Sequence, residues 1–296
     1  MIIPFAAHRI LNAILIRIAP LLSDKSFIRL KFRLFKGYWL DLNNPQTFCE
    51  KLQWLKLHNK RKDFTMMVDK IDAKKYVSSI IGEEYIIPTL GVYDSFEDID
   101  FDLLPNQFIV KCSHNSSGGV ICKDKTNFDT SIVKKHIEKY INKTYFIQNR
   151  EYPYKNVPHR IIIEKYLTNG TDNELNDYKF YCFNGRAEYC QLIADRSTKE
   201  TIDFFNRNWD HQEFIGLNAK AVFADKEVKK PENYSEMLDV ADKIAHKINT
   251  PFVRIDLYNA NKRIYFGEIT FFPLSGFGSF RPKVWDNKLG ELIKLP

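Results

Sequence analysis

Alternating apolar and polar residues near the end of the chain predict a β-hairpin. Two apolar runs, Phe252–Tyr258 and Arg263–Ile269, flank a polar connector at 259–262, and such alternation around a short polar turn is typical of paired strands. Asp256 lies in the first run and Glu268 in the second. In an antiparallel pair these two positions can share one face of the sheet.

Two carboxylates on one sheet face repel each other unless a cation lies between them. Mg²⁺ held on nucleotide phosphates is the cation we expect, because it favours a few carboxylate oxygens together with phosphate oxygens. Arg254 has the same strand parity as Asp256, so it should add a fixed positive charge to this face. For the hairpin taken alone, the alternative is a surface hairpin with scattered charges.

The first part of the chain predicts helices. Thr47-Phe-Cys-Glu50 is a capping box at the start of an amphipathic helix, Phe48–His58. A second helix, Val68–Ile81, should end at Gly82. The apolar segment His8–Leu22 contains two arginines and a proline, so it is too short and too charged to span a bilayer. We expect a packed helix there, with a membrane-surface helix as the alternative.

The middle of the chain predicts a mostly antiparallel sheet with a few helices. Asn184-Gly185 between two apolar runs is the strongest hairpin signal, because this pair suits a type I′ turn. The expected strands lie at 107–112, 120–123, 160–167, 177–183, 186–193 and 201–206, with short strands in 85–93 and helices at 129–142 and 231–248. This order predicts an α+β or mixed α/β fold with two layered units and a cleft between them.

A loop of small residues, Ser113-His-Asn-Ser-Ser-Gly-Gly119, joins two of these strands. Its backbone N–H groups and hydroxyls could face a polyanion, and glycine lets the backbone come close to it. The loop is not a Walker A motif, because no Gly-Lys-Ser/Thr follows and no helix begins there. A surface hairpin without a ligand is the alternative.

Composition narrows the classes of partner. The 296 residues suffice for one large or two to three small domains, and the net charge of +7 suggests an anionic partner. The sequence contains no dense Lys/Arg run with interleaved aromatic residues, so we do not expect nucleic acid. Five cysteines without a C-x-x-C spacing indicate reduced, cytosolic thiols, neither a zinc site nor a disulfide framework.

The candidate site residues have chemistry suited to a nucleotide. Lysines neutralise phosphate oxygens, the backbone at a strand end can hydrogen-bond an adenine edge, a carboxylate can accept from ribose hydroxyls, and acidic residues bind a metal. In chain order, these candidates are Lys70, Lys111, the 113–119 loop, Glu164–Leu167, Asp177, Lys179, Arg254, Asp256, Glu268 and Thr270.

Several motifs in this order resemble the signature of the ATP-grasp superfamily, with a spacing similar to that of D-alanine–D-alanine ligase-type enzymes. They are Asp69-Lys70, Val110-Lys111 with its loop, Ile163–Leu167, Arg254-Ile-Asp256 and Glu268-Ile-Thr270. From about residue 30 onward the chain is most similar to the TupA-like ATP-grasp group, which is associated with teichuronopeptide and surface-polysaccharide biosynthesis. The features that carry this resemblance are Asn44–Trp54, Val68–Lys70, Asp100–Pro105, Asp177–Gly185 and Gly290–Pro296.

The resemblance implies an α+β, ATP-grasp fold in which two α+β subdomains clasp ATP behind a helical N-terminal extension. We expect the helical N-terminal region at 1–65, the ATP-grasp N-terminal and lid subdomain at 66–168, and the C-terminal catalytic subdomain at 169–296. The implied reaction uses ATP and Mg²⁺. A carboxylate attacks the γ-phosphate to give an acyl phosphate and ADP, and an amine then displaces phosphate to form an amide.

The resemblance also assigns roles to residues. Arg254 and Lys111 are the implied catalytic residues, with Arg254 stabilising charge on the acyl-phosphate oxygen. The metal would be held by Asp256 and Glu268, and by Thr270, which stands where the ligases have Asn and is a weaker ligand. The implied nucleotide-binding residues are Lys70, Lys111, Ser116, Ser117, Gly118, Gly119, Glu164, Lys165, Tyr166, Leu167, Asp177 and Lys179.

A few residues are left open. Lys74 and Lys75 face either the cleft or solvent. The turn Ser275–Gly278 should lie beside the acceptor. Weaker candidates for acceptor binding are Arg196, Arg281 and His114, whereas His159 and His211 are expected to be ordinary surface histidines.

The implied substrates are an acidic sugar and an amino acid. We expect a uronic acid of a capsular or O-antigen type polysaccharide, or of its precursor, to be joined to an amino acid amine, with the reverse polarity as a variant. The expected location is the cytoplasm, with peripheral association at the inner membrane. The alternative function is a glycosyltransferase, for which Asp100-Phe-Asp102 would be the D-x-D motif. A phosphotransferase and a non-catalytic nucleotide-binding module are the remaining hypotheses.

Overall fold

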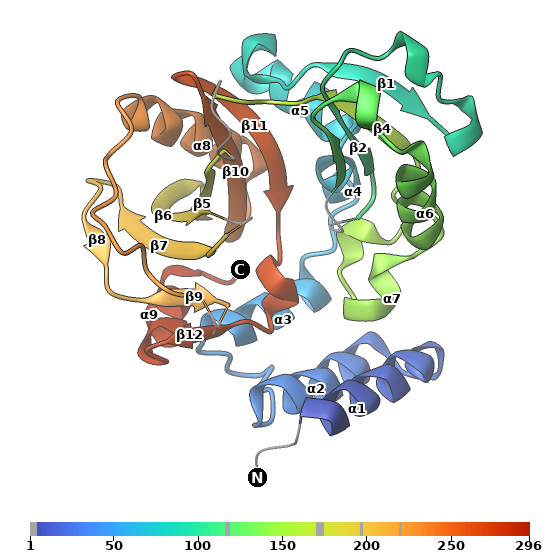
Figure 1. Cartoon of the computed structure of the whole chain (residues 1–296). Helices are drawn as coiled ribbons and strands as arrows, with labels where there is room; N and C mark the ends of the chain where they lie inside the picture. Colours follow the sequence, from blue (N-terminus) through green and yellow to red (C-terminus); the bar gives the residue numbers. More distant parts are fainter. Residues whose placement is uncertain (1–4, 116–118, 170–174, 196–197, 219–220) are drawn as a thin grey trace.

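Two antiparallel sheets of unequal size lie on opposite sides of the molecule, and helices α1 and α2 lie apart from both at one end (Figure 1). The computed structural model describes residues 5–115, 119–169, 175–195, 198–218 and 221–296. Its α-helices are α1 (Phe5–Arg17), α2 (Asp24–Lys36), α3 (Phe48–His58), α4 (Phe64–Val68), α5 (Asp72–Ile81), α6 (Thr130–Tyr140), α7 (Tyr145–Asn149), α8 (Tyr234–Ile248) and α9 (Val284–Leu292).

The larger sheet has the strand order β11-β10-β5-β6-β7-β8. Helix α8 packs on β5, β6 and β10, and the buried side chains between them belong to a core that extends to the N-terminal helices. Its strands are β5 (Asp177–Phe183), β6 (Arg186–Ala194), β7 (Thr201–Asn206), β8 (His211–Gln212), β10 (Phe252–Ala260) and β11 (Arg263–Thr270). A separate two-stranded sheet pairs β9 (Ile215–Leu217) with β12 (Ser279–Arg281).

The smaller sheet has the order β1-β4-β2-β3 and a core of its own. Helix α6 packs on β2 and β3 and contributes Val133 and Ile137 to this core. The strands are β1 (Thr89–Tyr93), β2 (Phe108–Cys112), β3 (Gly119–Cys122) and β4 (Ile161–Lys165). A bridge between Ile86 and Phe266 connects the segment before β1 to strand β11 of the larger sheet.

Local signals in the sequence place several elements well. Helix α3 begins at its capping box, in which the Thr47 side chain accepts from the backbone of Glu50 and the Glu50 side chain accepts from that of Thr47. The Asn184-Gly185 turn joins β5 to β6, and both residues have positive φ angles, as a type I′ turn requires. The predicted α+β fold with helices at the N-terminus is confirmed.

The single helix predicted at 68–81 is wrong, because the chain breaks between α4 and α5. Asp69 is fully buried, and its carboxylate accepts from the Ile71 backbone N–H at 2.8 Å and from Arg160 at 2.8 Å. Aspartate can bond its own backbone two residues on, which competes with helix formation. The break lets the Lys70 backbone N–H donate to the Ser113 carbonyl, and so it holds Lys70 beside the 113–119 loop.

Candidate active site

The last hairpin places Asp256 and Glu268 directly opposite each other. The strands extend further than predicted, so the turn consists of Asn261 and Lys262, both with positive φ. From this turn the pairing would bring Asp256 opposite Gly267, but the register shifts after Leu257, and Gly267 is the extra, unpaired residue of a β-bulge. Since a one-residue shift moves side chains to the other face, the bulge puts the two carboxylates on the same side.

Arg254 links the groups on this face. Its Nε donates to Asp256 at 2.6 Å, and its Nη2 donates to Asp256 at 2.7 Å, to Glu268 at 3.2 Å and to the Thr270 hydroxyl at 3.1 Å. One guanidinium nitrogen, Nη2, thus donates to an oxygen of each of the three side chains predicted to hold a metal. Lys179 on the neighbouring strand β5 makes a further ion pair with Asp256 and lies 3.9 Å from an oxygen of Asp177.

The two carboxyl groups differ in environment. Asp256 is buried, and this burial raises its pKa even though Arg254 acts in the opposite direction. Burial also acts to raise the pKa of Glu268, but the charges of Lys179 and Lys70 outweigh it and lower that pKa to about 2. The Glu268 side chain remains 38% exposed. Glu268 is therefore an ionised carboxylate with a face open to the pocket.

This donor set fits Mg²⁺, which takes oxygen ligands and usually combines one or two carboxylates with water and phosphate oxygens. Glu268 is the accessible ligand, and Asp256 would contribute an oxygen now bound by Lys179 and Arg254. The Thr270 hydroxyl already bonds to Glu268 at 3.2 Å. Within the described residues no group of three or more His, Cys, Asp or Glu could hold a metal ion.

Lysines from the smaller sheet and from α5 meet at Glu164. Lys111 on β2 donates to Glu164 on β4 at 2.7 Å, and Lys74 makes a second ion pair with it. Burial would raise the pKa of Glu164, but these two lysines lower it to about 2. A Cβ at position 119 would lie 2.7 Å from Cγ of Lys111. Gly119 therefore leaves room for this lysine.

Lys70 connects the two halves of the site. Its ammonium donates to the Asn115 carbonyl at the start of the loop. Burial lowers its pKa, Glu268 acts to raise it, and Lys111 acts to lower it further. Lys70 is therefore within electrostatic reach of both the metal-binding candidates and the smaller sheet. Ser116, Ser117 and Gly118, also predicted to contact phosphates, lie outside the described residues.

A cavity of about 160 Å³ lies between the two sheets at the predicted adenine position. Its walls are mainly apolar, and a few polar groups line one part of it, which is the usual character of a small-molecule pocket. The lining residues are Ile87, Ile109, Lys111, Ile121, Glu164, Lys165, Tyr166, Leu167, Leu175, Asp177 and Tyr258. All four residues of the predicted strand-end segment and the predicted ribose residue Asp177 are among them.

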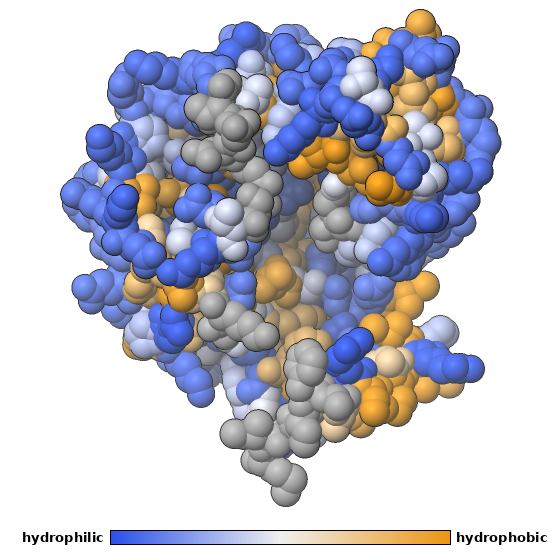
Figure 2. Space-filling model, viewed as in Figure 1, coloured by the Kyte–Doolittle hydropathy of each residue, from blue (hydrophilic) through white to orange (hydrophobic). Residues whose placement is uncertain are grey.

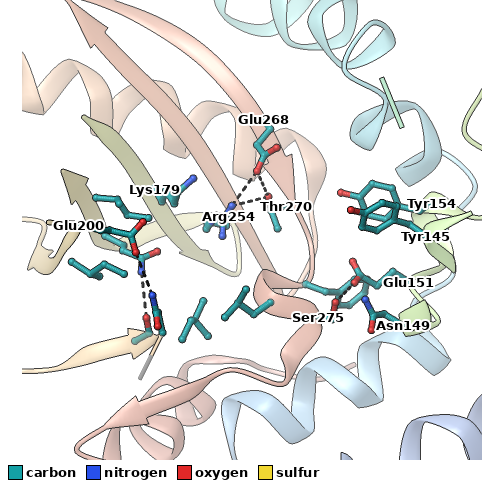
Figure 3. Close-up of a pocket in the computed structure, with 18 residues that line it drawn as sticks. Tyr145, Asn149, Glu151, Tyr154, Lys179, Glu200, Arg254, Glu268, Thr270 and Ser275 are labelled. Carbon is teal, nitrogen blue, oxygen red and sulfur yellow. Dashed lines mark hydrogen bonds and ion pairs between the residues drawn. The ribbon is translucent and has the colours of Figure 1, made fainter. Parts of the chain in front are cut away.

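A second cavity, of about 450 Å³, is lined by the Arg254 cluster itself. Figure 3 shows Arg254, Thr270 and Glu268 in its middle, Glu200 on one side, and Tyr145 and Tyr154 on the other. The turn predicted to lie beside the acceptor contributes Ser275, whose hydroxyl donates to Glu151. The cavity has room for a sugar or amino acid next to the cationic groups.

Sequence reasoning missed most of this second cavity. The residues that line it without having been singled out include Tyr145, Asn149, Glu151, Tyr154, Gln191 and Glu200. They come from segments with no shared motif, so spacing gave no signal. Lys74, whose orientation the sequence left open, is buried and bonded to the Ile87 carbonyl as well as to Glu164.

Two of the three weaker candidates for acceptor binding have other surroundings. Arg281 donates to the Ala221 carbonyl and does not line the described cavities. His114 is buried against His159 with ring centroids 3.9 Å apart, and burial lowers its pKa to about 4. Arg196 lies outside the described residues. His159 and His211 are exposed, as predicted, and His211 pairs with Asp203 at 2.9 Å.

The sequence from residue 50 to residue 294 matches the family model described as TupA-like ATPgrasp. The chain belongs to this family. The resemblance to the TupA-like ATP-grasp group was predicted from about residue 30 onward, and the motifs that carry it fall almost entirely within the matched range. A search of curated proteins found no match to this member of the family.

Two solved ligase structures are among those to which this chain is similar. A D-alanine–D-alanine ligase from Bacillus anthracis complexed with ATP aligns at 16% identity with a TM-score of 0.44, over 77% of this chain and 63% of that one. The ATP-grasp ligase PsnB complexed with minimal precursor, Mg and ADP aligns at 11% identity with a TM-score of 0.43, over 83% and 65%. The TupA-like chain thus spans less than two thirds of the length of these structures.

Proposed function

We propose that this protein is an ATP- and Mg²⁺-dependent ligase that joins a carboxylate to an amine through an acyl phosphate. The observation that carries the proposal is the position of Asp256 and Glu268, which share one face of the β10–β11 hairpin, with Glu268 within electrostatic reach of Lys70. A carboxylate pair beside lysines is what a metal–triphosphate complex requires. Membership of an ATP-grasp family supports ATP as the triphosphate.

The nucleotide would lie in the cleft between the sheets. The apolar walls of the 160 Å³ cavity would hold adenine, with Glu164 and the backbone of Lys165–Leu167 at its edge and Asp177 on the ribose. Lys111, Lys70 and Lys179 would bind phosphate oxygens. Mg²⁺ held by Asp256 and Glu268, with Thr270 beside them, would neutralise charge on the transferred phosphoryl group.

The reaction would take place at Arg254, which lines the larger cavity. A carboxylate oxygen of the substrate attacks the γ-phosphorus, the bond to the bridging oxygen breaks, and ADP leaves. The amine then attacks the carbonyl carbon, loses a proton, and expels phosphate to leave an amide. Arg254 and Lys111 would stabilise the charge that develops on the transferred group, so that catalysis is mainly positioning and electrostatics.

For the substrates, we propose a uronic acid of a surface polysaccharide or its precursor, and an amino acid. The net charge of +7 suits an acidic glycan, and the large cavity is lined by two tyrosines, Tyr145 and Tyr154, as well as by Arg254. We propose a cytoplasmic location because all five cysteines are free and buried. We also propose residues 66–168 and 169–296 as the clasping subdomains, with 1–65 as their extension.

The glycosyltransferase alternative depends on Asp100-Phe-Asp102 as a D-x-D motif, and the surroundings of these residues do not favour it. Asp100 and Asp102 are exposed, and the Asp100 carboxylate accepts from the Asp102 backbone N–H at 2.9 Å in a short turn. Neither residue lines the two cavities described above. The D-x-D pattern here is that of a turn.

Hydroxylamine provides the test of an acyl-phosphate intermediate. With ATP, Mg²⁺ and a panel of uronic acids and amino acids as carboxylates, the protein should release ADP and form a hydroxamate. Glu268→Gln should reduce both products about 100-fold or more, whereas Glu232→Gln, at an exposed ion pair with Lys262, should leave them unchanged. ADP release without hydroxamate for every carboxylate would refute the proposal.

A further inference from the structure

Helix α1 presents apolar side chains to solvent. Ile10, Ile14 and Ile18 are 61%, 51% and 39% exposed, and their spacing of four puts them on one helix face, which Leu11 also joins. Leu21, in the turn that follows, is 85% exposed. These five residues form an exposed surface, here called the α1 face. In Figure 2 apolar side chains gather over α1 and α2 at the lower right.

The packing of α1 does not account for this surface. The helix packs against α2 and the short helix at Ala19–Leu21, and its Leu15 is buried, with 7% exposed. The packed helix expected from the sequence is therefore packed through a different side than the α1 face. Several adjacent exposed aliphatic residues on a protein surface mark a site of interaction with another protein or with a membrane.

The same segment carries most of the chain's excess positive charge. Residues 5–37 contain seven Lys and Arg but one acidic residue, Asp24, so they hold six of the chain's seven net positive charges. Asp24 is itself paired with Lys60 and Arg150. The exposed members are Arg9, Arg17, Lys25, Arg29 and Arg33. Arginines beside an apolar helix face are the pattern of helices that lie in the surface of an anionic bilayer.

We propose that the α1 face docks on an anionic lipid surface, with α1 lying in the plane of the interface and the neighbouring arginines on lipid headgroups. Charge decides between a lipid surface and a second copy of this chain, because two copies would bring the five exposed basic residues of one against the same five of the other. A helix of 13 residues is too short to cross a bilayer. Among the described helices, none has both the length and the apolar composition of a membrane span.

Docking in this way would bring the larger cavity close to the membrane. Lys31 of α2 donates to the Gln148 carbonyl at 2.6 Å and to the Asn149 side chain at 2.7 Å, and Asn149 lines that cavity. Lys56 of α3, which follows α2, donates to the Ser275 carbonyl at 2.7 Å on the cavity's edge. On the proposed function, this geometry suits a substrate carried by a lipid.

Vesicle co-sedimentation of the full chain tests the docking independently of the reaction. The probes are vesicles of phosphatidylcholine alone and vesicles in which a third of the lipid is phosphatidylglycerol. Wild type should sediment with the anionic vesicles at least tenfold more than with the neutral ones, and high salt should weaken this binding through screening. Ile14→Ser with Ile18→Ser should lower the bound fraction about tenfold, and Arg9→Gln with Arg17→Gln severalfold.

Matched controls come from α6, where Ile132 is 55% exposed and two lysines are exposed. Ile132→Ser, and Lys135→Gln with Lys139→Gln, should bind vesicles as wild type does. Thermal melts should be unchanged in every variant, since the substituted side chains are exposed. Equal sedimentation with both vesicles, or unchanged binding by the α1 variants, overturns the proposal. So does a wild-type dimer in light scattering that Ile14→Ser with Ile18→Ser dissociates, because a second copy then covers the face.

Discussion

At the scale of single residues, the site is held by buried charges that need one another. Glu164 is 4% exposed and lies between Lys74 and Lys111, and Asp256 lies between Arg254 and Lys179. Removing one member of such a group leaves a buried charge uncompensated, which costs about 3–5 kcal/mol of stability. Asp256→Asn would therefore lower both folding stability and turnover. Glu268 is more exposed, so Glu268→Gln should lower turnover with less effect on folding stability.

The lowered pKa of Glu164 makes its contribution to stability depend on pH. Because its folded pKa of about 2 lies below the ordinary 4.5, the ionised group stabilises the fold above about pH 4.5. That contribution is lost as the pH falls toward 2. The shift corresponds to about 3 kcal/mol, reduced by the burial that lowers the pKa of Lys74. We predict that Glu164→Gln lowers the free energy of unfolding by up to about 3 kcal/mol at pH 7, measured by urea unfolding.

The pH profile distinguishes this ionic role from simple packing. The difference between wild type and Glu164→Gln should shrink between pH 5 and pH 3. In this range the glutamate of the unfolded wild-type chain takes up a proton, which favours unfolding, while folded Glu164 stays largely ionised and glutamine does not change. The exposed Glu232→Gln should match wild type throughout. An offset for Glu164→Gln that stays constant over this range would show that the ion pairs do not cause the loss of stability.

At the scale of elements, the β-bulge at Gly267 determines which face Glu268 occupies. A Cβ at this position would lie 3.0 Å from the Asp256 carbonyl oxygen and 3.0 Å from the Tyr258 ring. We predict that Gly267→Ala pushes β11 away from β10 next to the metal-binding candidates. Turnover should fall about tenfold or more, since small displacements of catalytic groups are costly, and the Mg²⁺ concentration for half-maximal ADP release should rise.

A glycine far from the site supplies the control. Gly37 ends α2 with φ of 80°, and a Cβ there meets nothing within 4 Å. Gly37→Ala should lower the melting temperature through backbone strain, yet leave the turnover and Mg²⁺ dependence of the folded protein unchanged. If both variants have the same Mg²⁺ dependence as wild type, the bulge does not position a metal ligand.

The elements that the sequence predicts well are those set by neighbouring residues. The capping box at Thr47 and the Asn184-Gly185 turn involve groups within three residues of each other, so their signals are local. The break at Asp69 depends on Arg160, which is 91 residues away, and the bulge at Gly267 depends on the register of β10 with β11. The shared face of Asp256 and Glu268 was predicted correctly, but the bulge that produces it leaves no pattern in the alternation of apolar and polar residues.

At the scale of the whole molecule, the site is divided between two sheets with separate cores. Glu164 and Lys111 belong to the smaller sheet, and Asp256 and Glu268 belong to the larger one. Lys70 lies between them, where the charges of both Lys111 and Glu268 act on it. A single nucleotide that spans the cleft would contact both sheets, so binding energy should depend on residues of both at once.

A double-mutant cycle measures this dependence. Lys111→Ala and Glu268→Gln should each weaken binding of a non-hydrolysable ATP analogue severalfold in calorimetry with Mg²⁺ present. Because both side chains would act on the same metal-bound triphosphate, their effects should be non-additive by at least about 0.5 kcal/mol. Without Mg²⁺, Glu268 has no link to the phosphates except through Lys70, and the coupling should become smaller. The control substitutions Lys135→Ala and Glu232→Gln, both at exposed residues, should neither weaken binding of the analogue nor show coupling. Additive effects of Lys111→Ala and Glu268→Gln with Mg²⁺ present would mean that the two sheets do not share one nucleotide.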